Sequence, residues 1–183
     1  MATRLTPVDC FAIGLLLATC VACAEQPRSS NARFALHRHS HSVSFLVPQG
    51  WEVSPFRQQD FPSYSSIEFA PAGHRSDTDL SVRLTEVDPV DSQGQSAIHA
   101  KRLSTHREDY PSAASRTVGR VDVANQRVWI QLIESSGYQY YDAVIPLGDQ
   151  TLSLELLHSA ATGIEQYKRA FEEVTKSCVI SSH

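Results

Sequence analysis

Three histidines at alternate positions, His37, His39 and His41, carry the clearest chemical potential in this sequence. In an extended segment alternate side chains point to one face, so the three imidazoles would converge there. Imidazole is a common ligand of zinc and copper. The spacing therefore predicts a metal site with Zn or Cu, and we expect no other cofactor. The alternative is an exposed histidine-rich segment in front of the first strand, because no fourth ligand is evident.

An aromatic group on neighbouring predicted strands is the second candidate site. Tyr138 and Tyr140 share one face of their strand, and Tyr141 points to the other. Exposed aromatic side chains are enriched in protein interfaces, so Tyr138 and Tyr140 are predicted to bind a partner. Trp129 lies on the preceding strand and is expected to pack across strands instead.

Motifs of known enzyme classes are absent from the sequence. It contains no Gly-x-Ser-x-Gly elbow, P-loop, Gly-x-Gly-x-x-Gly turn or His-Glu-x-x-His zinc motif. Cys178 and His158 are one conceivable pair of nucleophile and base. However, Cys178 continues the apolar stripe of the last predicted helix, and a buried thiol is inert. We therefore predict that the protein is not an enzyme.

The first 24 residues have the pattern of an export signal. Arg4 precedes an apolar run from Cys10 to Ala24 that is shorter than the ~20 residues of a membrane-spanning helix. Polar residues follow, and Ala22-Cys23-Ala24 provides a small-x-small cleavage site before Glu25. A buried core helix or a membrane anchor fits this polar break less well. The chain is predicted to be exported.

The same segment also resembles a bacterial lipoprotein signal, in which a cysteine is lipidated and becomes the new N-terminus. Cys20 follows a suitable leucine, but Thr19 stands where a smaller residue is usual. Cys23 follows a suitable alanine, but Cys20 replaces the leucine. Both routes stay open: a soluble periplasmic protein, or one anchored to the envelope membrane by lipid. Cleavage before Glu25 leaves Cys178 alone, so an internal disulfide is excluded for that mature chain.

Length and charge set the remaining bounds. The chain has 183 residues, 42% of them hydrophobic and 20% charged, which is ordinary for one globular domain. The formal net charge of −4 argues against a nucleic-acid partner, which would require a basic surface. The predicted organisation is a signal peptide over 1–24, a polar linker over 25–33 and one domain over 34–183.

Alternating apolar and polar residues predict the strands of this domain. Val43, Phe45 and Val47 form one buried face, and Pro48-Gln49-Gly50 predicts a turn with proline second and glycine fourth. Trp51 then begins a returning strand. Further strands are predicted over 65–69, 80–85, 117–123, 126–134, 138–147 and 151–158. Loops are predicted over 55–63 and 71–78, and hairpin turns at 125–126 and 148–149.

Two helices complete the predicted set. The first is capped by Asp91 or Ser92 and runs to about Tyr110, with a thin apolar stripe that places it on the surface. The second begins near residue 162 and carries a core-facing stripe at spacings of three and four: Ile164, Tyr167, Phe171, Val174 and Cys178. Hairpins with short links imply a mostly antiparallel sheet, so the fold class is α+β.

The segment from Val43 to Trp51, a strand followed by Pro-x-Gly-Trp, resembles the PsbP-like superfamily. Mog-type Ran-binding proteins and DcrB-type bacterial envelope proteins share this fold. The order of strands and helices over about 34–181 is similar too. The resemblance implies an antiparallel sheet flanked by helices, and a non-catalytic role in binding or assembling other proteins. It implies an envelope protein partner but maps no functional residue onto this chain.

Overall fold

The computed structural model describes residues 32–38, 40–53, 59–61, 64–72, 78–86, 94–160 and 162–182. These residues form a mostly antiparallel sheet structure with two helices, which confirms the predicted α+β class. The predicted signal peptide, with Cys20 and Cys23, lies outside the described residues, as do the proposed caps Asp91 and Ser92. No helix within the described ranges is long and apolar enough to cross a membrane.

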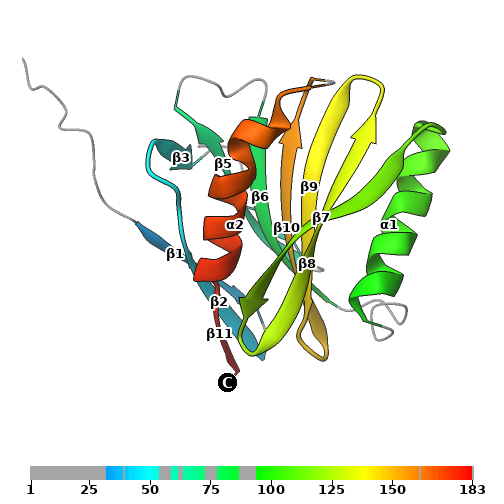
Figure 1. The fold of residues 1–183 in the computed structure, drawn as a ribbon. Coiled ribbons are helices and arrows are strands. Elements are labelled where there is room, and N and C mark those ends of the chain that lie inside the picture. Colours follow the sequence, from blue (N-terminus) through cyan, green and yellow to red (C-terminus); the bar gives the residue numbers. More distant parts are fainter. Residues whose placement is uncertain are drawn as a thin grey trace, which may run out of the picture.

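The larger sheet has eight strands. Seven follow the order β3-β5-β6-β10-β9-β8-β7 (Figure 1), and β4 pairs with β5 beside them. All pairs within it are antiparallel. The strands are β3 (Trp51–Val53), β4 (Gln59–Phe61), β5 (Tyr64–Pro71), β6 (Thr78–Glu86), β7 (Ala114–Val123), β8 (Gln126–Ser135), β9 (Tyr138–Pro146) and β10 (Gln150–His158).

The smaller sheet pairs β1 (Arg33–Arg38), β2 (His41–Leu46) and β11 (Val179–Ser182) in the order β1-β2-β11. It therefore joins the two ends of the described chain. Phe45 of β2 meets Phe69 of β5 edge to face, with ring centroids 5.7 Å apart. This contact links the small sheet to the large one through the hydrophobic core.

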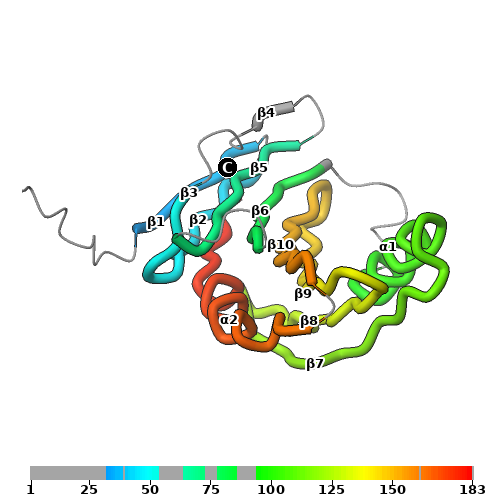
Figure 2. Tube along the Cα trace, turned by 90° about the horizontal axis from the view of Figure 1, so that it is seen from above, coloured from blue at the N-terminus to red at the C-terminus, as the bar shows by residue number. Residues whose placement is uncertain are grey.

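The two helices lie on opposite sides of the large sheet (Figure 2). α2 (Lys168–Ser177), preceded by the 3₁₀ turn Ile164–Tyr167, covers the apolar side. Its predicted stripe is confirmed: Ile164, Phe171, Val174 and Cys178 are buried, and Tyr167 is partly buried. α1 (Gln95–Asp109) covers the other side and buries only Ile98 and His99.

Several local expectations were wrong in detail. The turn after β2 runs from Pro48 to Trp51, whose N–H donates to the Pro48 carbonyl at 3.1 Å. Gly50 is thus its third residue, with φ 80°, a conformation that favours glycine. β3 does not return to β2 but pairs with β5, because the chain passes to the other sheet. The β7–β8 turn is Ala124-Asn125, both with positive φ, one residue earlier than predicted.

Three further element boundaries differ from the sequence expectation. β4 lies within the predicted loop 55–63. A three-residue strand is not stable by itself, and β4 forms because it pairs with β5. α1 begins at Gln95, behind Gly94, and its first turn has no side-chain cap. β11 was not predicted: it is short, follows a helix directly and acquires its partners only from β2.

Candidate functional site beneath helix α1

The three sequence-predicted metal ligands do not lie along one strand. Arg38 pairs with His41 across a tight turn between β1 and β2, and His37 pairs with Ser42. Paired residues share a face and neighbours alternate, so His37 and His41 point to opposite faces of the small sheet. His41 contacts Asp149 at 3.4 Å. His39 lies outside the described residues, so the metal site itself stays a prediction.

The predicted binding tyrosines do share a face, as expected, but helix α1 covers that face. Tyr140 is buried, and its ring lies 4.8 Å from that of His106. Tyr138 packs edge to face on Tyr110 at the end of α1, with centroids 4.8 Å apart. These rings form a seam between α1 and β9 rather than an open surface. Tyr141 points to the core, where it meets Phe171.

The conceivable thiol nucleophile is buried. Cys178 donates to the Val174 carbonyl at 3.5 Å, and burial raises the pKa of its thiol to about 12. His158 is occupied elsewhere: Nδ1 bonds Thr78 Oγ1 at 2.9 Å and Nε2 lies 3.2 Å from the Thr162 carbonyl. The burial of Cys178 that its helical stripe predicted is confirmed.

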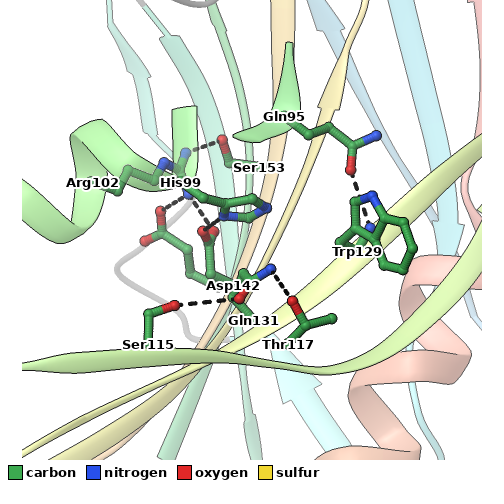
Figure 3. Close-up of polar contacts among 10 residues, drawn as sticks. Gln95, His99, Arg102, Ser115, Thr117, Trp129, Gln131, Asp142 and Ser153 are labelled. Atoms are coloured by element: carbon green, nitrogen blue, oxygen red, sulfur yellow. Dashed lines mark hydrogen bonds and ion pairs between the residues drawn. The ribbon is translucent and has the colours of Figure 1, made fainter. Parts of the chain in front are cut away.

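Trp129 is 38% exposed on the α1 side of β8, and its expected packing across strands stays a prediction. Gln95 in the first turn of α1 accepts from the Trp129 backbone N–H at 3.1 Å and donates to the Arg127 carbonyl at 2.8 Å. These two bonds fix the start of the helix over β8, and Figure 3 shows the bond to Trp129. The N-terminus of α1, which has no side-chain cap, is thus held by hydrogen bonds to the sheet.

Asp142 is the centre of the contacts beneath α1. It lies in the middle of β9 and is fully buried, in a strand that is otherwise almost wholly apolar. A buried carboxylate requires partners, and α1 supplies them from two successive turns. His99 Nδ1 donates to Asp142 Oδ2 at 2.6 Å, and Arg102 Nη1 donates to Oδ1 (Figure 3).

Arg102 extends this network to β10. Its guanidinium also bonds Glu155 Oε1 at 2.8 Å and Ser153 Oγ. Burial by itself would raise the pKa of Asp142, but the charge of Arg102 and the bond from His99 outweigh burial and hold it below the ordinary value. Burial likewise opposes the charge of Arg102, yet Asp142 and Glu155 raise its pKa. The ion pair is therefore formed at neutral pH.

His99 is held in one tautomer by this arrangement. An ionised carboxylate can only accept, so Nδ1 carries the hydrogen, and Nε2 is an acceptor when the ring is neutral. Nε2 is buried and no described residue donates to it. An unpartnered buried acceptor is unfavourable by about 1–3 kcal/mol, so it favours binding of a donor from outside.

A hollow of about 600 Å³ opens beside His99 on the β7–β8 side of α1. Its floor holds Trp129 and a chain of polar bonds: Ser115 Oγ donates to Gln131, and Gln131 donates to Thr117 at 2.8 Å (Figure 3). No side chain lining it carries a formal charge when His99 is neutral. The hollow thus combines an aromatic surface with donors and acceptors in a neutral setting, which is typical of binding sites.

A histidine held by a carboxylate is also the arrangement of a general base, but a base acts on a nucleophile within hydrogen-bond reach. None of the described hydroxyl groups bonds His99 Nε2, and Ser115 and Thr117 are engaged with Gln131. Among the described residues, His99 Nε2 therefore has no nucleophile bonded to it.

Sequence reasoning missed His99, Arg102 and Asp142. The signal was present: an aspartate in an apolar strand, and a helix with a thin apolar stripe that instead carries His99 and Arg102 three residues apart on one face. No sequence pattern, however, indicated that α1 would pack on β9.

Comparison with known proteins shows the fold. No family model and no curated protein matches the sequence. Cyanobacterial PsbP from Synechocystis sp. PCC 6803 superposes with a TM-score of 0.56 at 15% identity, covering 82% of this chain and 92% of that chain. The Saccharomyces cerevisiae Ran-binding protein Mog1p gives 0.54 at 11% identity, covering 82% and 95%. The chain has the PsbP/Mog1-like fold that its Pro-x-Gly-Trp segment led us to expect.

Proposed function

We propose that the protein is a non-enzymatic binding module of the bacterial cell envelope, and that the hollow beside His99 takes a segment of a protein partner. The observation that carries this proposal is the buried, unpartnered Nε2 of His99 next to the exposed ring of Trp129. A partner N–H or hydroxyl satisfies Nε2, and an apolar group covers the indole. Exposed tryptophans of this kind are frequent anchors of interfaces.

Structural likeness agrees with a binding role. One of the two superposed proteins, Mog1p, is described as a Ran-binding protein. The fold hosts diverse functions, so the likeness supports the class of activity and identifies no partner. The lack of a nucleophile in contact with His99 among the described residues supports the same class over hydrolysis.

Export completes the proposal. The apolar segment ending at Ala24 carries the chain out of the cytoplasm, and processing yields either Glu25 or a lipidated Cys20 or Cys23 as the new N-terminus. The protein is then periplasmic, or held at the envelope membrane by its lipid alone. Intact-mass spectrometry of the purified protein distinguishes these ends, because diacylation adds a large, defined mass.

The test is affinity purification of the full-length protein from detergent-solubilised envelopes of its own host, followed by mass spectrometry. We expect one stoichiometric partner. Trp129→Ala should abolish its capture while leaving the fold intact, since the ring is 38% exposed.

Leu157→Ala is the matched control, because Leu157 is 41% exposed on the same side of the sheet but does not line the hollow. It should capture the partner normally. A Trp129→Ala variant that retains the partner would remove this hollow from the proposal, and a turnover activity abolished by His99→Gln would overturn the non-enzymatic assignment.

A further inference from the structure

A second hollow lies on the other flank of α1, separate from the one proposed for the protein partner. It has a volume of about 330 Å³ and is bounded by α1, β6, β9 and β10. The residues that matter for its chemistry are Arg83, Lys101, Arg102, Tyr140 and Glu155. None of them was singled out for this role by sequence patterns, except that Tyr140 was predicted to bind a partner.

Two buried donors in the lining of this hollow have no acceptor among the described residues. They are the hydroxyl of Tyr140 and Nε of Arg83. Tyr140 is 5% exposed, so water does not reach its hydroxyl freely. Burial, and then the nearby carboxylates of Asp142 and Glu155, raise the pKa of this phenol, which keeps it protonated and able to donate. Unsatisfied buried donors are rare in native proteins and call for a ligand.

The Arg83 side chain is held in place by an aromatic ring. Its guanidinium carbon lies 4.9 Å from the centroid of the Tyr64 ring, which is cation–π distance. A side chain fixed in this way loses little further freedom when it binds a ligand, so its unpartnered Nε–H is already oriented.

Three of the side chains that line the hollow are cationic. Arg83, Lys101 and Arg102 face it, against Glu155 on the rim and Asp142 beneath. Arg102 neutralises part of both carboxylates through its bonds to them. Nε of Arg83 has no acceptor among the described residues, and this cation lies in the same lining as the Tyr140 hydroxyl, which also lacks one.

We propose that this hollow binds an oxyanion, the phosphate or carboxylate group of a small molecule, which accepts from Tyr140 and Arg83. Such a group supplies the acceptors that the protein does not, and its charge balances that of Arg83. Arginine is well suited to this role because its planar donors match carboxylate and phosphate oxygens.

The experiment observes the Arg83 Nε–H resonance by ¹⁵N NMR while the purified mature protein, in a buffer free of oxyanions, is titrated with inorganic phosphate or with succinate. We expect a saturable shift with at least one of them, and the pair decides between phosphate and carboxylate. Tyr140→Phe should weaken the binding about ten-fold or more, the usual effect of removing one hydrogen bond to a charged group.

Tyr138→Phe is the matched control: it removes a hydroxyl from the same strand face, but Tyr138 does not line the hollow. It should bind as the wild type does. A linear, non-saturating response to both anions would overturn the proposal, as would equal affinity in the wild type and Tyr140→Phe. Arg83→Met provides a second variant, followed by backbone amide shifts of β6, in case Tyr140→Phe fails to fold. Unchanged anion affinity in Arg83→Met would also overturn the proposal.

Discussion

The two faces of the large sheet differ in chemistry: the face under α2 is apolar, and the face under α1 is polar. Under α2 the contacts are apolar, with Phe171 and Val174 packed on the core and Tyr141 against them. Under α1 the central contacts are polar, between buried Asp142 and His99 and the partly buried Arg102, and two hollows flank them. The first face stabilises the fold by removing apolar area from water. The face under α1 contains buried charges that must be paired, and an apolar face would have no such requirement. Its composition therefore points to function rather than to stability.

The largest expected effect tests the apolar face. Phe171→Ala removes a fully buried ring and should lower the free energy of unfolding by about 3–5 kcal/mol, measured by urea denaturation. Leu157→Ala on the α1 side should change it by less than about 0.5 kcal/mol, because that side chain is largely exposed. Equal losses in the two variants would contradict the division between the faces.

The next effect tests the polar face. Asp142→Asn removes the fully buried charge that pairs with Arg102, and we expect a loss of about 3 kcal/mol at neutral pH because the partly buried guanidinium then keeps only Glu155 as an ionic partner. The exposed Asp149→Asn should cause a much smaller loss.

The same variant has a pH signature. The folded-state pKa of Asp142 is lowered from 3.8, so its stabilisation is complete above that value and is lost as the pH falls through the lower folded value. The wild type should therefore lose stability in that acid range more steeply than Asp142→Asn does. Parallel curves of unfolding free energy against pH would show that the pair does not form.

The smallest expected effect concerns the histidine cluster, which belongs to neither face. Titration with zinc and with copper should show a site that disappears when His37, His39 and His41 are all replaced by alanine. Because His37 and His41 point to opposite faces of the small sheet, we expect the affinity to be modest. Metal binding that survives the triple replacement would refute the site.

Most elements were predictable because their apolar residues follow a single period. β2, β6 and β8 alternate at a period of two, and α2 carries a stripe at the helical period, so local pattern and tertiary burial agree. β11 was not predictable, since four residues contain too little pattern and their order comes from β2. The direction of β3 after the turn at Gly50 also depended on a partner strand, β5, that no local signal names.

The candidate site divides in the same way. Tyr138 and Tyr140 were correctly assigned to one strand face, because alternation along a strand is local geometry. Whether that face is open or covered depends on α1. The thin apolar stripe of this helix did not indicate which strands it would cover. The exposure of Trp129 was not predictable for the same reason: the sheet face around it is only partly covered by the helix.

The sequence alone determined the class of the fold, the stripe that buries Cys178 and the resemblance at Pro-x-Gly-Trp, because each follows from spacing along the chain. Only the tertiary structure decided that α1 brings His99 and Arg102 onto Asp142, and that a hollow remains on each side of that contact. The physical reason is that a buried charge specifies a need for partners but not their identity. The identity depends on which distant element the packing of the whole chain brings within hydrogen-bond reach.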